Sequence, residues 1–333
     1  MTERSEFGER IDVSWQLNDT TMSGTLVKPN GAGPFSAVVM VAGSGPTDRD
    51  WTSRLLSGTN GSAPLIADEL ARAGFASLRY DKRASGQHPP EYWRALAGTF
   101  SMQSHTDELA AAVRTLAGQE FVRDDQIFGL GNSEGTLHVL NYQLSQPPIP
   151  FAGLILVAPP GRSVGDVARA QLAPQAALIP NGDALLALYD QAIARFVDGG
   201  STSPDPALPQ DVQTLLQSLD TPMNLPFSRE LWTADAAGPL SRAECPVLVL
   251  IGKKDLQVDW QADGEILQQA AQGRSDVTFD YPESANHVLK HESRPRSELT
   301  LPDVMPRYNA DESRLDPEAI ADVLQWLSEQ TGR

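Results

Sequence analysis

Strand-like and helix-like patterns alternate along most of the chain. Short segments rich in apolar residues predict strands at 37–42, 76–80, 126–130, 153–158, 246–251 and 277–281, and apolar spacing of three and four predicts helices at 63–73, 104–116 and 317–328. Two segments at 11–17 and 22–27 predict an N-terminal antiparallel hairpin. Strands that alternate with helices pair in parallel with right-handed crossovers, so we expect a mostly parallel, doubly wound α/β sheet.

This alternation stops between residues 159 and 240. The segment contains no strand-like run, is rich in Ala, Leu and Pro, and has helix-like stretches at 165–172, 184–196 and 211–219. A loop of that length without structure is unusual, so we predict a helical insertion over the carboxyl edge of the sheet. The chain is thereby divided into a core of residues 1–159 and 241–333 and a helical cap of residues 160–240. The polar, proline-rich stretch 291–316 predicts a surface loop.

The composition is typical of a globular protein, with 41% hydrophobic and 21% charged residues. The 26 basic and 43 acidic residues give a formal net charge of −17, which argues against binding to nucleic acid or to anionic membranes. No apolar stretch approaches the length of a membrane span, and residues 1–6 lack the apolar core of a signal peptide. The single cysteine, Cys245, permits no intramolecular disulfide. We therefore expect a cytoplasmic protein.

A serine lies in a glycine-framed turn between a predicted strand and a predicted helix. Ser133 is the centre of Gly131-Asn132-Ser133-Glu134-Gly135, which fits the pattern Gly-x-Ser-x-Gly. The glycines allow a tight turn, and the helix that follows offers free backbone N–H groups. This arrangement exposes a serine hydroxyl beside a base, as a nucleophile requires. Ser133 is the predicted nucleophile.

The base and the acid of a serine nucleophile are sought after it in the chain, in the order Ser, Asp or Glu, His. Among the five histidines, His287 and His291 lie well past Ser133, and His287 directly follows the last predicted strand. Asp255 ends the strand at 246–251, whereas Asp259 and Asp263 fall on the following loop and helix. We predict His287 as base and Asp255 as its orienting acid. A metal pair of His287 and His291 lacks a third ligand, so no metal is expected.

Two backbone donors are needed for the oxyanion of an acyl-transfer intermediate. We predict the N–H of Glu134 as one and the N–H of Ser44 as the other, since Ser44 lies in the glycine-rich loop 43–50 after the strand at 37–42. This loop lacks the Gly-Lys-Ser/Thr of a nucleotide binder. Its charged residues 48–50, and residues 81–83, are interpreted as local ion pairs that hold the loops.

In these motifs the chain resembles the α/β-hydrolases, specifically the serine esterase branch whose oxyanion loop reads Gly-Ser-Gly-Pro-x-Asp-Arg-Asp. The resemblance rests on residues 43–50, 81–83, 131–135 and 252–255 and on His287, in that order. It implies the α/β-hydrolase fold, ester hydrolysis by Ser133, Asp255 and His287, a helical cap after the sixth core strand, and no cofactor.

Three positions depart from the pattern of the family. Ala42 stands where many relatives have His, Asn132 replaces a common His before the nucleophile, and Ala84 replaces a frequent Gly. None of the three is expected to take part in the chemistry, but they can change how the loops pack.

The expected activity is hydrolysis of small to medium acyl esters through an acyl-enzyme. An amidase or peptidase, and a thioesterase or lysophospholipase, use the same residues and remain alternatives. A non-catalytic binding protein on this fold would be expected to have lost one of the three residues. Dehalogenase and epoxide hydrolase chemistry is disfavoured because residue 133 is Ser rather than Asp.

The lining of the substrate pocket is what the sequence predicts least well. Gly43 and Gly45 are expected to border it, and Phe196, Phe227 and Trp232 in the cap are candidates for its lining. The same aromatic residues also suit the cap's own core. The expected partner is a small-molecule ester, and the sequence does not fix the acyl length, the stereopreference or the oligomeric state.

Overall fold

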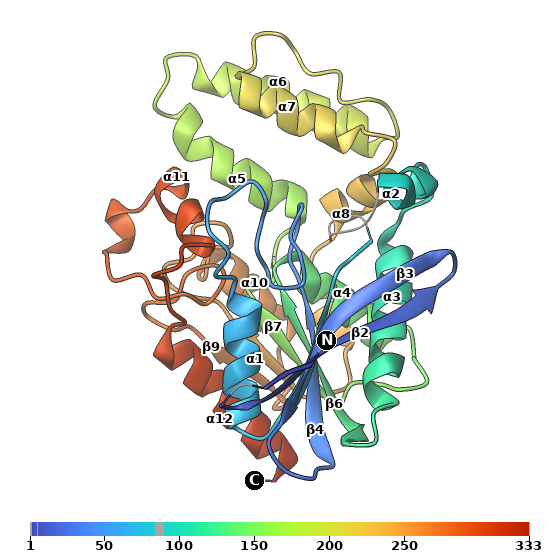
Figure 1. Ribbon diagram of the computed structural model, residues 1–333. Helices are drawn as coiled ribbons and strands as arrows, with labels where there is room; N and C mark the ends of the chain where they lie inside the picture. Colours follow the sequence, from blue (N-terminus) through green and yellow to red (C-terminus); the bar gives the residue numbers. More distant parts are fainter. Residues whose placement is uncertain (1, 5, 84–89, 333) are drawn as a thin grey trace.

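The computed structural model describes residues 2–4, 6–83 and 90–332. Within them, nine strands form one sheet with helices on both faces (Figure 1). In spatial order the strands are β1 (Thr2–Arg4), β2 (Gly8–Leu17), β3 (Thr20–Pro29), β5 (Ala76–Tyr80), β4 (Phe35–Val41), β6 (Val122–Asn132), β7 (Gly153–Val157), β8 (Val247–Leu250) and β9 (Val277–Asp280). The predicted α/β-hydrolase fold, with its N-terminal hairpin and mostly parallel sheet, is confirmed.

The direction of pairing changes once across the sheet. Strands β1, β2, β3 and β5 pair antiparallel in turn, whereas every pair from β5 and β4 through to β9 is parallel. The central strands β4, β7 and β8 and the second half of β6 (127–132) are almost entirely buried, as their apolar runs require. Parallel strands place the loops that follow them at one edge, so β4, β6, β8 and β9 deliver their loops to a common place.

Helices cover both faces of the sheet. On one face α1 (Ser62–Arg72) packs against α12 (Pro317–Thr331), and on the other α3 (Met102–Ala117) packs against α4 (Glu134–Leu144) (Figure 1). The remaining core elements are α2 (Pro90–Leu96), α10 (Ala262–Ala270), α11 (Leu301–Val304) and the 3-10 turns η1 (Arg296–Glu298) and η2 (Met305–Tyr308). No helix of the described residues is long and apolar enough to cross a membrane.

Five helices lie between β7 and β8, where the sequence predicts an insertion. They are α5 (Val164–Ala176), α6 (Gly182–Val197), α7 (Gln210–Leu219), α8 (Phe227–Thr233) and α9 (Ala237–Arg242). Figure 1 shows α6 and α7 farthest from the sheet, with α5 beneath them. Residues of α6, α7 and α8 share a small apolar core of their own. In contrast, α9 packs against α4 and α10, and its Leu240 belongs to the main core.

Candidate active site

Ser133 lies at the sharp turn from β6 into α4. Its φ of 53° and ψ of −121° are unusual for a residue with a side chain. The flanking glycines make the turn possible: a Cβ on Gly131 would lie 2.3 Å from the Gly135 carbonyl oxygen, and one on Gly135 would lie 2.4 Å from the Val41 carbonyl oxygen. The backbones of the turn and of β4 therefore touch, and they leave the Ser133 side chain facing a cavity.

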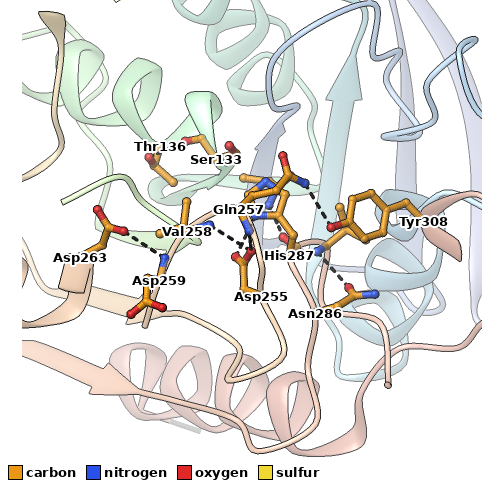
Figure 2. Close-up of polar contacts among 12 residues, drawn as sticks. Ser133, Thr136, Asp255, Gln257, Val258, Asp259, Asp263, Asn286, His287 and Tyr308 are labelled. Atoms are coloured by element: carbon orange, nitrogen blue, oxygen red, sulfur yellow. Dashed lines mark hydrogen bonds and ion pairs between the residues drawn. The ribbon is translucent and has the colours of Figure 1, made fainter. Parts of the chain in front are cut away.

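Asp255 and His287 form a buried pair beside this turn. Nδ1 of His287 lies 2.8 Å from Oδ2 of Asp255, whose side chain is 0% exposed. The other carboxylate oxygen, Oδ1, accepts the N–H groups of Gln257 at 2.7 Å and Val258 at 3.1 Å (Figure 2). Since an ionised carboxylate only accepts hydrogen bonds, Nδ1 carries a proton, and the neutral ring presents Nε2 as the basic nitrogen. The loop after β8 thus orients the histidine from the loop after β9.

Two asparagines hold the His287 loop in place. Asn132, the residue before Ser133, donates its side-chain amide to the His287 carbonyl at 2.9 Å. Oδ1 of Asn286 accepts the N–H groups of Val288 at 3.1 Å and Lys290 at 3.0 Å, which closes a tight turn around His287. The strand-to-helix turn and the histidine loop are therefore joined through Asn132.

Tyr308 of η2 packs beside the pair. Its ring centroid lies 6.3 Å from that of His287, and its hydroxyl accepts Nε2–H of Gln257 at 3.1 Å (Figure 2). Burial and the nearby Asp255 carboxylate raise the pKa of the Tyr308 hydroxyl. The raised pKa argues against Tyr308 as a base, and its side chain lines the cavity.

The loop after β4 passes directly over Ser133. A Cβ on Gly43 would lie 3.3 Å from Cβ of Ser133, so the loop and the serine are in contact. Within the described part of the chain, neither the N–H of Ser44 nor the N–H of Glu134 donates a hydrogen bond. Both residues line the cavity that Ser133 faces.

This cavity has a volume of about 340 Å³ and lies between the sheet edge and α5. Ser133 and His287 both line it, together with Val164, Val167 and Ala168 of α5 and with Leu55, Leu56, Val258 and Met305. Among the described residues of the lining, none is Lys or Arg, and the one acidic residue is Glu134. The site therefore combines a serine and a histidine–aspartate pair with neutral, largely apolar walls.

Comparison with known proteins identifies the family of the chain. Residues 38–299 match the Alpha/beta hydrolase family. The chain belongs to this family. It is 27% identical over 282 residues to Esterase EstD of Thermotoga maritima, a match that covers 83% of this chain and 60% of the relative. The chain thus spans about 60% of the length of that curated relative. The family and this relative support hydrolase activity.

Solved structures of alpha/beta hydrolases share the fold over nearly the whole chain. The Pyrococcus furiosus esterase Pf2001 has a TM-score of 0.55 at 16% identity, covering 97% of this chain and 93% of that one. The proline iminopeptidase of Mycobacterium smegmatis has a TM-score of 0.55 at 19% identity, covering 96% and 98%. At these identities the likeness concerns the fold alone.

The residues predicted for the pocket of this alpha/beta hydrolase divide into two groups. Gly43 and Gly45 line the cavity that Ser133 faces. Phe196 and Trp232 lie instead in the apolar core of the insertion, and Phe227 packs against the His105 ring, with ring centroids 4.8 Å apart. The structure does not bring these three to the cavity, because helices that stand away from the sheet need large side chains for their own core. The small residues of α5 line the cavity in their place.

The charged residues in and near the loop after β4 pair with other segments rather than within one loop. Arg49 pairs with Asp81, Arg79 with Asp50, Lys82 with Glu134 and Arg83 with Glu108, all at N–O distances of 2.5 to 2.7 Å. The interpretation as local ion pairs therefore holds in part only: Asp48 does bond locally, to Thr52. The other pairs tie the loop after β4 to β5 and to the helices behind it.

A cluster of two histidines and one glutamate lies on helices α3 and α4. His105, Glu134 and His138 are buried, with ligand-type atoms within 4.8 Å of one another. This is a donor set that zinc accepts in proteins. Here, however, Oε1 of Glu134 already accepts a hydrogen bond from the Lys82 ammonium at 2.7 Å, and this ammonium supplies the positive charge.

The remaining histidines of the sequence are His88 and His291. His291 is 46% exposed and pairs with Asp316 at 2.9 Å. His88 and Ala84, noted in the sequence, lie outside the described residues.

Sequence reasoning missed several residues that shape the site. Asn132 and Lys82 were interpreted as packing or local charge, and Tyr308 and Gln257 were not singled out. For Lys82 a signal existed: it follows β5, the neighbour of β4 in the sheet, so its side chain lies near the loop after β4. For Tyr308 there was none, because the irregular segment before α12 carries no periodic pattern.

Proposed function

We propose that the protein is a carboxylic ester hydrolase that works through an acyl-enzyme on Ser133. The observation that carries the proposal is the strained Ser133 turn, which faces the same cavity as a histidine held at 2.8 Å by a buried aspartate. This is the combination of nucleophile, base and orienting acid that acyl transfer requires.

The proposed reaction has two halves. Nε2 of His287 takes the Ser133 proton as Oγ attacks the ester carbonyl carbon, and the N–H groups of Ser44 and Glu134 bind the resulting oxyanion. The intermediate then expels the alcohol, which leaves with the proton from His287. Water attacks the acyl-serine with His287 as base, the carboxylic acid departs, and Ser133 regains its proton.

The neutral cavity favours esters with uncharged acyl and alcohol parts. A peptidase that acts on chain ends needs a charged group to hold the terminus, and a lysophospholipase meets a charged head group. The described lining holds no Lys or Arg, and the carboxylate of its one acid, Glu134, is already paired with Lys82. A cavity of about 340 Å³ at the lower end of ligand-site volumes suits a small to medium ester. The proposed cap of residues 160–240 would set the acyl length through α5.

A hydrolysis panel tests the proposal. p-Nitrophenyl esters of increasing acyl length are compared with an aminoacyl p-nitroanilide and an acyl thioester, with the wild type and Ser133→Ala side by side. We expect turnover of the esters to exceed that of the anilide and to fall by about 10³-fold or more in Ser133→Ala. Near-full ester activity in Ser133→Ala would refute the assignment, and preferred hydrolysis of the anilide would favour the peptidase.

A further inference from the structure

A buried lysine connects the two segments that carry the proposed oxyanion donors. The Lys82 side chain, at the end of β5, is 2% exposed. Its ammonium donates to the Gly43 carbonyl at 2.8 Å and to Oε1 of Glu134 at 2.7 Å. Gly43 lies in the loop after β4 and Glu134 begins α4, so one cation bridges the loop and the helix on which the oxyanion would rest.

The bond to Gly43 acts directly on the Ser44 donor. The carbonyl of Gly43 and the N–H of Ser44 belong to one peptide group, which is trans, so they point in opposite directions. An ammonium that holds the carbonyl on one side therefore fixes the direction of the N–H on the other. It also polarises the amide, since a charged donor on the oxygen draws electron density from the nitrogen and strengthens its N–H as a donor.

Both the backbone and the side chain of Glu134 belong to this arrangement. Its backbone N–H is the second proposed donor, while its side chain, 3% exposed, anchors Lys82. Burial alone would raise the pKa of the Glu134 carboxyl, but the Lys82 charge and the hydrogen bond from His138 hold it well below its usual value. Burial and the neighbouring His105 lower the pKa of His138 to about 3, so its neutral ring donates Nε2–H to Glu134 at 2.9 Å. The carboxylate is thus kept ionised beside the lysine.

We propose that Lys82 is a positioning residue that aligns and polarises the oxyanion donors, an inference that rests on the proposed function. It touches neither the substrate nor Ser133. Its effect falls on the transition state, in which negative charge develops on the carbonyl oxygen, and much less on the binding of a neutral ester.

The test compares kcat, KM and the inhibition constant of a trifluoromethyl ketone that carries the acyl chain of the best ester. Ser133 adds to this ketone to give an anionic hemiketal, so its affinity reports on the oxyanion site. We expect Lys82→Met to lower kcat and weaken the ketone in parallel, by about 10–100-fold, with KM changed less than about threefold. Arg83→Met is the matched control: it breaks an equally buried pair with Glu108 that contacts neither Gly43 nor Glu134.

A double variant separates positioning from charge balance. Lys82→Met leaves a buried carboxylate unpaired, which can unfold the chain, whereas Lys82→Met with Glu134→Gln leaves no buried charge at the pair, and the glutamine oxygen still accepts from His138. We expect the double variant to fold, as judged by its melting temperature, and to keep the defect, because the Gly43 carbonyl still lacks its donor. Wild-type kcat and ketone affinity in either variant would overturn the inference, as would an equal loss in Arg83→Met.

The inference and the proposed function fail in different ways. A wild type that hydrolyses no ester and binds no ketone contradicts the proposed function, and the role of Lys82 falls with it. A wild type that is active through Ser133, with Lys82→Met unchanged, leaves the esterase standing and refutes the positioning role alone.

Discussion

At the scale of single residues, the site depends on which atoms accept hydrogen bonds and which atoms donate them. Among the described residues, the Asp255 carboxylate accepts three hydrogen bonds, two from backbone N–H groups and one from His287. The two backbone bonds fix the carboxylate, and the third fixes the tautomer of the histidine. Because the side chain is fully buried, no water replaces a lost partner.

Asp255→Asn should therefore disable the base while keeping the fold. The asparagine oxygen can still accept the N–H groups of Gln257 and Val258, but its NH₂ group then faces Nδ1 of His287 and moves the ring proton to Nε2. We expect kcat for a p-nitrophenyl ester to fall by about 10³–10⁴-fold with a melting temperature close to that of the wild type. Asp259→Asn is the control, since the Asp259 carboxylate accepts the N–H groups of Gln261 and Ala262 at the start of α10 and pairs with Arg296, but does not contact His287. Equal losses in the two variants would contradict the account.

That Ser133, Asp255 and His287 lie close together was predictable from the sequence, because each of them follows an apolar strand. Asn132 and Lys82 were harder, since their contacts join residues 155 and 52 positions apart, respectively. A side chain whose partner lies on another loop has no local signature, and only the strand order shows that the two loops meet.

At the scale of elements, the turn between β6 and α4 depends on close backbone contact with β4. The strand segments were predicted to within a few residues, because continuous apolar runs mark them strongly. In the insertion, α5, α6 and α7 were predicted to within a few residues, whereas α8 and α9 were not predicted. The lining of the cavity by α5 was not predicted either, since alternative amphipathic faces of a short helix cannot be told apart without the neighbour they pack on.

Gly135→Ala tests this contact. The added Cβ would lie 2.4 Å from the Val41 carbonyl oxygen, so β4 and α4 must separate, and we expect the free energy of unfolding to fall by about 1–3 kcal/mol. Esterase activity should fall as well, because the turn carries Ser133. Gly238→Ala in α9 is the control: its nearest neighbour would be 3.6 Å away, and alanine favours a helix, so stability should be unchanged or slightly higher. Chemical denaturation measures both.

At the scale of the whole molecule, the chain carries a net charge of −17. Carboxylates of α12 and its N-cap lie close enough to Asp280 of β9 to interact electrostatically with it or with one another. Burial and the nearby carboxylates of Asp280, Glu318 and Asp316 raise the pKa of Asp322 from 3.8 to about 6. A pKa raised by folding means that the ionised carboxylate costs stability. This cost is fully present above pH 6 and disappears as the pH falls towards 3.8.

Asp322→Asn should accordingly stabilise the protein in a pH-dependent way. We expect its melting temperature to exceed that of the wild type by roughly 1–4 °C at pH 7–8. The difference should shrink between pH 6 and pH 4, where the wild-type carboxyl becomes protonated. Thermal unfolding followed by circular dichroism across this range measures it, and a gain that is constant with pH, or larger at pH 4 than at pH 7, would contradict the assigned cause.

The central claim is that Ser133 is the nucleophile of an ester hydrolase, and a fluorophosphonate tests it most directly. The reagent forms a bond from phosphorus to an activated serine oxygen and releases fluoride, and peptide mass spectrometry locates the adduct. The account predicts one adduct per chain, on Ser133, which is absent in Ser133→Ala and forms much more slowly in Asp255→Asn. A wild type that remains unlabelled, or that carries its adduct on another residue, would contradict it.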